Sequence, residues 1–306
     1  MARLAPFGAL FASLFIVTAP AQKPPPKSEP RPTSIVFAVA TAGGEMTIDP
    51  IIGLGPRGRV LPAGTADEDS LKSFAANYYK AGRKYRLISG GGDAGTIIVK
   101  ESKMGSDCFR TGASVEPRMA GRLGGNVMGL ATDSQTLGQR PPSRRAPTDA
   151  ERAGVETLVR TLLAQKRLTA AQLRNLKTIN LTALDLNNDG AAELVGTFKV
   201  ARGKGAADLL FLLAESQGAG GGFRAGLSNH VGLKVADLPG PEVFETAGAG
   251  GFLSEILIDQ LDIDGDGTGE LFTYGQSLEG AQYKVYKKTR GRWLKLHEGY
   301  VYRCAY

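Results

Sequence analysis

The chain has few of the residues on which common catalytic motifs depend. Its 306 residues include two histidines, His230 and His297, and contain neither an H-E-x-x-H segment nor a G-x-S-x-G segment. The first absence excludes the zinc-protease helix, and the second excludes the nucleophile turn of the α/β-hydrolases. A glycosidase with paired carboxylates stays possible, because the two acids of such a pair have no fixed spacing in sequence.

Cysteine is almost absent, since Cys108 and Cys304 are the only two in the chain. In an oxidising compartment they could form one disulfide, which would close a long loop and stabilise the fold by up to about 5 kcal/mol. The alternative is that both are unpaired thiols, because the sequence does not show that they lie close together.

Long apolar runs are missing after the N-terminal segment. No later segment has about 18 uninterrupted apolar residues, which excludes a membrane-spanning helix there. Residues 1–21 combine Arg3, an apolar run over residues 10–17 and the tripeptide A-P-A at 19–21, which together are typical of a secretory signal peptide. No cysteine lies near the cleavage point, so a lipid anchor is not expected. We therefore predict a secreted or periplasmic protein without a transmembrane segment.

Glycine and proline are abundant. The 41 glycines and 16 prolines indicate many turns, while a hydrophobic content of 42% is enough for one or two cores. Two proline-rich segments divide the chain. The predicted organisation is a signal peptide at 1–21, a Pro-rich linker at 22–33, an N-terminal β-rich domain at 34–134, a Pro/Arg-rich linker at 135–147 and a C-terminal domain at 148–306.

The N-terminal domain is expected to consist of short strands and turns. Residues 84–100 are typical of a hairpin whose turn is the glycine-rich segment 90–95. A phosphate-binding function for that turn is not favoured, since it lacks the Lys-Ser/Thr pair of a P-loop and is followed by a β-branched strand. Residues 70–79 are expected to form a short helix with its aromatic side chains buried.

Two helices are predicted at the start of the C-terminal domain. Thr148 with Glu151, and Thr169 with Gln172, each match the capping-box pattern S/T-x-x-E/Q. Apolar residues between 155 and 163 recur at helical spacing, so the first helix has one apolar face. We expect this face to pack against the core; a partner-binding helix is the alternative.

Two acidic segments in the C-terminal domain repeat one another. Residues 184–194 and 261–271 both follow the pattern L-D-aliphatic-(D/N)-x-D-G-x-x-E-L. Counted from the first aspartate, oxygen-bearing side chains at positions 1, 3, 5 and 9, with glycine at position 6, suit a hard cation such as Ca²⁺. A metal-free polar hairpin turn is the alternative, but such a turn needs only one D-G pair.

The surroundings of these segments differ from those of an EF-hand. Position 12, where an EF-hand has a bidentate glutamate, is Gly196 in the first copy and Thr273 in the second. The flanking residues are β-branched or alternate in polarity, which indicates strands and not helices. Acidic loops of this pattern between strands resemble the FG-GAP or VCBS repeat of β-propellers and of many exported proteins. The resemblance covers only the C-terminal part of the chain.

The resemblance implies two bound Ca²⁺ ions. In the first site the ligands would be the side chains of Asp185, Asn187, Asp189 and Glu193 and the backbone carbonyl of Ala191. In the second site they would be Asp262, Asp264, Asp266 and Glu270, with Thr268 at position 7. The family more often has aspartate at position 9, so the glutamate is a departure in both copies. Because the second site has four carboxylates and the first has three, we expect the first site to bind more weakly.

Each acidic segment is expected to lie among four short strands, which is the size of one propeller blade. Two blades are too few to close a propeller, so the pair is expected to pack on the N-terminal half, to form a sandwich-like unit or to pair with another chain. The predicted fold is mainly β. It has two FG-GAP-like four-stranded repeats, arranged as a partial propeller or sandwich-like unit, preceded by a short helical pair and an N-terminal β-rich domain.

The formal net charge of +7 arises from scattered basic residues. In the basic cluster at 284–292, the side chains of Tyr283, Tyr286 and Trp293 lie within or beside the cluster, a combination that could bind polyanions or sugars. A solvated strand face is the alternative. Nucleic acid is not an expected partner, because no motif supports it.

Together these features predict an exported, non-enzymatic calcium-binding protein. Its ions would organise the β-repeats for interaction with a protein or glycan partner in the cell envelope or outside the cell. One alternative is an exported hydrolase or carbohydrate-active enzyme whose site lies in the N-terminal domain. Another is a polyanion-binding envelope protein.

Overall fold

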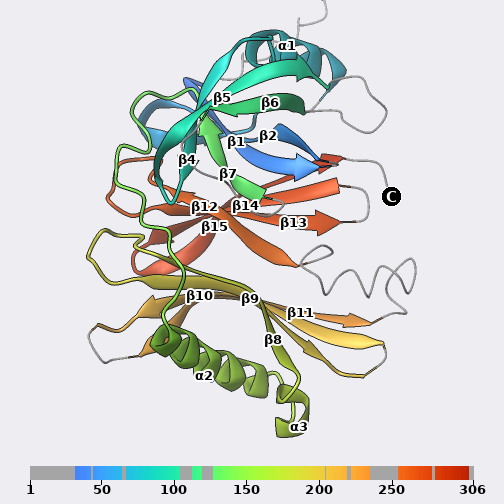
Figure 1. Ribbon diagram of the computed structural model, residues 1–306, viewed down its shortest axis with the longest axis vertical. Helices are drawn as coiled ribbons and strands as arrows, with labels where there is room; N and C mark the ends of the chain where they lie inside the picture. The colour runs from blue at the N-terminus through green and yellow to red at the C-terminus, as the bar shows by residue number, and fades with distance from the viewer. Residues whose placement is uncertain are drawn as a thin grey trace, which may run out of the picture. The chain divides into compact units, whose positions relative to one another are not determined.

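Figure 1 shows the computed structural model of the protein, which describes residues 32–42, 44–63, 67–103, 112–118, 127–203, 205–218, 222–234, 254–277 and 280–302. The structure is mainly β, which confirms the predicted class: 56% is strand and 16% is helix. The predicted signal peptide, most of the predicted linker at 22–33, Cys108 and Cys304 lie outside the described residues. None of the described helices combines the length and the apolar character needed to cross a membrane.

Six strands in the N-terminal part close into an antiparallel barrel. Their order is β1-β7-β4-β5-β6-β2, and β2 pairs again with β1, while the short β3 extends the sheet from β2. The strands are β1 (Ser34–Ala42), β2 (Glu45–Leu54), β3 (Val60–Leu61), β4 (Lys84–Ser89), β5 (Gly92–Ser102), β6 (Ala113–Arg118) and β7 (Val127–Thr132).

Strand β1 is apolar on both faces, which explains its nearly continuous run of apolar residues. Ile35, Phe37 and Val39 point into the barrel, where they join a core that includes Tyr85. Val36 and Ala38 point the opposite way and pack against another sheet. The predicted short helix is confirmed as α1 (Glu68–Tyr78), which contributes Phe74 to the core inside the barrel.

The C-terminal part forms two four-stranded antiparallel sheets, each built from consecutive strands. One has the order β11-β10-β9-β8 and the other the order β12-β13-β14-β15. In each sheet an acidic segment joins the first strand to the second. The strands are β8 (Leu176–Leu184), β9 (Glu193–Ala201), β10 (Ala206–Ser216), β11 (Phe223–Lys234), β12 (Glu255–Leu261), β13 (Glu270–Ser277), β14 (Gly280–Thr289) and β15 (Arg292–Tyr302).

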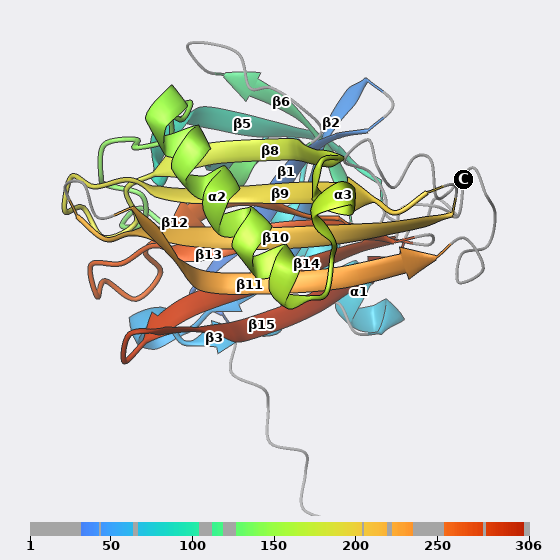
Figure 2. The ribbon, with the colours of Figure 1, turned by 90° about the horizontal axis from the view of Figure 1, so that it is seen from below.

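Both predicted capping boxes are confirmed. Thr148 and Glu151 begin α2 (Asp149–Gln165), and Thr169 and Gln172 begin α3 (Ala170–Leu173). The predicted apolar face of α2 packs on the β8–β11 sheet through Val155, Val159 and Leu163, so it belongs to the core. Figure 2 shows α2 crossing the strands of this sheet.

Hydrophobic clusters join these layers into one compact unit, residues 32–306. One cluster lies between the barrel and the β12–β15 sheet and includes Val36, Ile52, Phe272 and Tyr283. Another lies between the two four-stranded sheets and includes Trp293. The sheets therefore stack face to face, one of the arrangements that the sequence left open.

The predicted linker at 135–147 is hydrogen-bonded to both four-stranded sheets. Arg144 Nη1 donates to the backbone oxygen of Ile258 (2.8 Å) in β12. The backbone N–H of Arg145 donates to the oxygen of Ala183 (3.0 Å) in β8, and the Ala183 N–H donates back to Arg145. The segment thus links β8 and β12, which belong to two sheets that pack against each other.

Candidate metal centre

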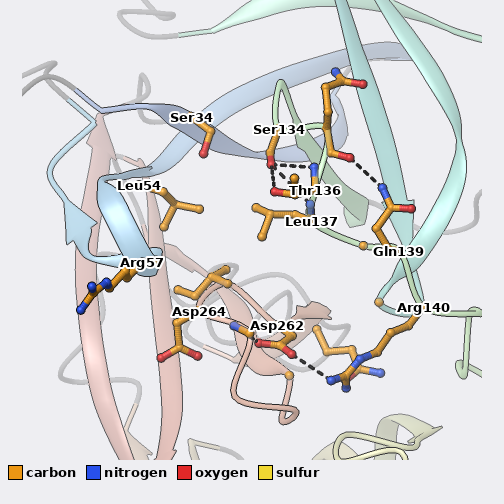
Figure 3. A pocket seen from close by; sticks show the side chains of 18 of the residues that line it. Ser34, Leu54, Arg57, Ser134, Thr136, Leu137, Gln139, Arg140, Asp262 and Asp264 are labelled. Atoms are coloured by element: carbon orange, nitrogen blue, oxygen red, sulfur yellow. Dashed lines mark hydrogen bonds and ion pairs between the residues drawn. The ribbon is translucent and has the colours of Figure 1, made fainter.

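The two acidic segments line one cleft. We call residues 185–193 the first loop and residues 262–270 the second loop. The cleft has a volume of about 650 Å³, and its opposite wall comes from the barrel, at residues 54–58 and 133–138. Figure 3 shows Asp262 and Asp264 at this cleft, with a hydrogen bond between Asp262 and Arg140.

Hydrogen bonds connect the two loops directly. The backbone N–H of Gly269 donates to the oxygen of Leu186 (2.7 Å). Gln260, just before the second loop, donates through Nε2 to the backbone oxygen of Asp185 (3.2 Å) and to Ser143 Oγ (2.8 Å). These bonds fix the position of one loop against the other.

In the first loop, the carboxylate of Asp185 organises the turn. It accepts hydrogen bonds from the backbone N–H groups of Asp189 (3.1 Å) and Gly190 (3.0 Å). Gly190 has φ +84°, a left-handed conformation that explains the glycine at position 6. Asn187 Oδ1 accepts from the N–H of Asp189 (3.2 Å), and Asp189 Oδ1 accepts from the N–H of Ala191 (2.8 Å).

The second loop repeats most of this geometry. The carboxylate of Asp262 accepts from the backbone N–H groups of Gly265 (2.7 Å) and Gly267 (3.1 Å). Gly267, at position 6, has φ +97°. Asp266 Oδ1 accepts from the N–H of Thr268 (2.9 Å), as Asp189 does from Ala191. The two sequence copies thus fold into similar turns.

The glutamates at position 9 are buried in both loops. Glu193 Oε2 accepts from the N–H of Leu186 (3.0 Å), and Glu270 Oε2 accepts from the N–H of Ile263 (2.9 Å). Only 7% of Glu193 and 1% of Glu270 is exposed. Burial disfavours the ionised form and raises the pKa of each carboxyl to about 7.

The loops differ most in their cationic neighbours. Lys287, from β14, donates from Nζ to one carboxylate oxygen of each of three second-loop residues: Asp264 (2.7 Å), Asp266 (2.6 Å) and Glu270 (2.9 Å). Burial alone would lower the pKa of Lys287, but these hydrogen bonds raise it above its usual value. Arg140 adds a second cation through its bond to Asp262 (2.9 Å).

The first loop has no such neighbours. In the part of the chain that the structure describes, Asp185, Asp189 and Glu193 form no ion pair with a lysine, arginine or histidine. The amide of Asn187 donates to Asp189 Oδ2 (2.9 Å) and is the nearest substitute for a cation. Three carboxylates therefore share the first loop without a positive charge to balance them.

The donor set of the loops is made of oxygen atoms, which suits Ca²⁺. In the second loop, carboxylate oxygens of Asp262, Asp264 and Glu270 lie within 4.8 Å of one another, the one group of this kind among the described residues. This arrangement can hold a cation, and the Lys287 ammonium already provides one. The first loop offers the same types of oxygen donor, with Asn187 in place of the aspartate at position 3, and its carboxylates form no ion pair among the described residues.

The ten residues that the sequence names as ligands all lie in these two loops. The contacts of Lys287 and Arg140 with the second loop were not predicted. Arg140 lies in the predicted linker, and Lys287 lies in a basic cluster with no acidic residue between 282 and 292. The signal that could have revealed Lys287 is strand pairing. Leu271 pairs with Tyr286, so Lys287 lies opposite Glu270.

The basic and aromatic cluster at 284–292 is largely engaged within the fold. Lys284 pairs with Glu255 (3.1 Å), and Lys288 pairs with Glu215 (2.7 Å). The rings of Tyr283, Tyr286 and Trp293 are at least 90% buried. These rings are packed in the cores and are not available to stack on a sugar.

Comparisons with family models, with curated proteins and with solved structures found no match for this chain. The resemblance of the acidic segments to FG-GAP or VCBS repeats therefore stays a prediction.

Gly58, between β2 and β3, packs closely against the second loop, and a substitution there tests this contact. A Cβ at this position would lie 2.3 Å from the backbone oxygen of Ile263 and 2.6 Å from Asp264 Cα, and its φ is +70°. Gly82 also has positive φ, at +81°, but a Cβ there would meet nothing within 4 Å. We expect Gly82→Ala to lower the free energy of unfolding by about 1 kcal/mol and Gly58→Ala to lower it by a further 1–3 kcal/mol or so. Urea denaturation of both variants measures the difference, and equal losses would contradict the contact.

Proposed function

We propose that this is an exported, non-enzymatic calcium-binding protein whose first loop holds a Ca²⁺ ion that organises the β-repeats and the adjoining cleft. The observation that carries the proposal is the uncompensated charge of the first loop. Asp185, Asp189 and Glu193 have no ion-pair partner among the described residues. Glu193 is 93% buried, and the charges of Asp189 and Asp185 add to the effect of burial in raising its pKa.

Electrostatics favours a cation at the first loop. Two carboxylates about 4 Å apart repel each other by roughly 1 kcal/mol in water and by more where solvent is partly excluded. A bound Ca²⁺ would offset this repulsion and the cost of burying Glu193. The position-1, position-3 and position-5 side chains and Glu193 would hold the ion, with the backbone oxygen of Ala191 as a further ligand.

The cleft beside the loops is the surface that an ion would shape. Asp185 and Asn188 of the first loop line it together with Asp262 and Asp264 of the second. Because Gly269 is hydrogen-bonded to Leu186, an ion that orders the first loop would also steady the second. We propose this cleft as the place where a protein or glycan partner outside the cytoplasm binds.

The two alternative functions have less support. The barrel interior is filled by apolar side chains such as Phe37, Tyr85 and Leu87, which does not favour a hydrolase site inside it. The polyanion-binding alternative needs free basic side chains, but Lys284, Lys287 and Lys288 are bound to carboxylates.

Melting curves in excess EDTA, in about 10 mM Ca²⁺ and in about 10 mM Mg²⁺ test the proposal. With a dissociation constant of about 0.1 mM, one occupied site adds roughly 2.7 kcal/mol, which corresponds to a rise of about 5–10 °C in the melting temperature. We expect this rise in Ca²⁺, a smaller one in Mg²⁺, and none in Asp185→Ala. Equal melting temperatures in all three solutions would mean that the acidic loops are only turns.

A further inference from the structure

We propose that Lys287 is the resident cation of the second loop, so that this loop does not take up calcium while Lys287 is present. The two sequence copies then differ in function. The first loop binds the metal ion, and the carboxylates of the second are neutralised by a lysine of the protein itself. The contacts of Lys287 alone support the proposal for the second loop, while the role of the first loop rests on the proposed function above.

The position of Lys287 Nζ is that of a central cation. It contacts Asp264, Asp266 and Glu270, which are positions 3, 5 and 9 of the loop, at 2.6–2.9 Å. These are three of the four side chains that the sequence assigns to a metal. Only 20% of the Lys287 side chain is exposed, so its charge is screened little by solvent.

A calcium ion and the ammonium group exclude one another at this place. Both are positive, both need the same carboxylate oxygens, and Ca²⁺ requires its ligands at about 2.3–2.6 Å. The ion could enter only if Lys287 left, which would expose the ammonium to water but would break three charge-assisted hydrogen bonds. Arg140 opposes entry further, because it occupies Asp262, the position-1 ligand, at 2.9 Å.

The strand register explains why no lysine occupies the corresponding place in the first loop. Leu271 of β13 pairs with Tyr286, which sets Lys287 opposite Glu270. In the first copy Leu194 pairs with Ala214, which sets Glu215 opposite Glu193. The residue that faces the position-9 glutamate is thus a lysine in one copy and a glutamate in the other.

Glu215 has partners of its own, two from the β12–β15 sheet and one from β11. Trp293 Nε1 donates to Glu215 Oε1 (2.9 Å), and Lys288 and Arg224 form ion pairs with the same carboxylate. Among the described residues, Lys288 and Arg224 form ion pairs with Glu215 and none with the carboxylates of the first loop. The inference reverses the order of affinity expected from the number of carboxylates, because the loop with four carboxylates is the one already neutralised.

The test is a count of bound calcium in the purified full chain by equilibrium dialysis, at free Ca²⁺ up to about 10 mM. We expect one ion per chain in the wild type and two in Lys287→Gln, with the additional ion lost when Asp264→Asn is added. Lys287→Arg keeps the cation and should stay at one ion. Lys295→Gln removes an exposed lysine that pairs with Glu298, and it serves as the control for the change in net charge.

Two results would overturn the inference. One is a Lys287→Gln variant with the circular dichroism spectrum of the wild type that binds no additional ion. The other is a loss of bound calcium when Asp264→Asn is made in the wild type, a measurement that does not depend on the folding of the lysine variant. A wild type that binds no ion beside a Lys287→Gln variant that binds one would contradict the proposed function and support this inference. A wild type with one ion at the first loop and no gain in Lys287→Gln would support the proposed function and contradict this inference.

Discussion

Phe272→Ala is expected to lower the free energy of unfolding by about 3–5 kcal/mol and to leave a single unfolding transition. Phe272 is fully buried in β13 and belongs to the cluster between the barrel and the β12–β15 sheet. Its removal leaves a cavity in a cluster that also contains Val36 and Ile52 of the barrel and Tyr283 of β14. Both parts of the chain lose contacts at once, so neither should survive without the other.

Two probes that report on different regions can test this expectation. Trp293, the only tryptophan, is buried between the two four-stranded sheets, so its fluorescence follows their separation. Far-ultraviolet circular dichroism follows all strands, including those of the barrel. We expect both curves to shift together in Phe272→Ala and to stay in place in Leu294→Ala, whose side chain is 53% exposed. Two separate transitions, with the barrel unaffected, would instead favour independent domains on the two sides of 135–147.

Glu193→Gln is expected to have opposite consequences without and with calcium. Burial raises the pKa of Glu193 from 4.5 to about 7, so the folded state holds a proton more tightly than the unfolded state. Stability from this group is fully present below pH 4.5 and is lost as the pH rises through about 7. The neutral amide avoids this loss, so in EDTA at pH 8 the variant should be more stable than the wild type by about 1–3 kcal/mol.

Calcium should remove that advantage. The wild type gains roughly 2.7 kcal/mol from an ion bound with a dissociation constant of about 0.1 mM, while the variant has lost a charged ligand and gains little. Urea denaturation at pH 5 and pH 8, with EDTA or with Ca²⁺, gives all four differences. Glu116→Gln, at an exposed site on β6, is the matched control and should respond to neither change. A variant that is less stable than the wild type in EDTA at pH 8 would contradict the account.

Local features of the fold could be predicted from the sequence because they depend on neighbouring residues. The two capping boxes, the apolar face of α2 and the turns at Gly190 and Gly267 each follow from a few adjacent side chains. The acidic loops belong to the same class, since hydrogen bonds within each loop place their carboxylates. The side chains that the pattern names therefore lie in the two loops, and their role as ligands stays a prediction.

Features that depend on distant pairing could not be predicted in this way. The barrel closes because β1 pairs with β7 as well as with the adjacent β2. Val36 lies opposite Thr132, and neither strand's sequence contains a mark of so distant a partner. The contact of Lys287 with the second loop depends on the pairing of β13 with β14. The number of carboxylates in the second loop predicts the stronger metal site, but this number does not include Lys287, a cation that another strand supplies.

Anomalous scattering from crystals grown with about 10 mM CaCl₂ tests the central claim most directly. The account predicts one calcium peak, in the first loop, with oxygens of Asp185, Asp189 and Glu193 at about 2.3–2.6 Å. It also predicts Lys287 Nζ, and no peak, among the carboxylates of the second loop. A peak in the second loop with Lys287 displaced, or no peak in the first, would contradict it.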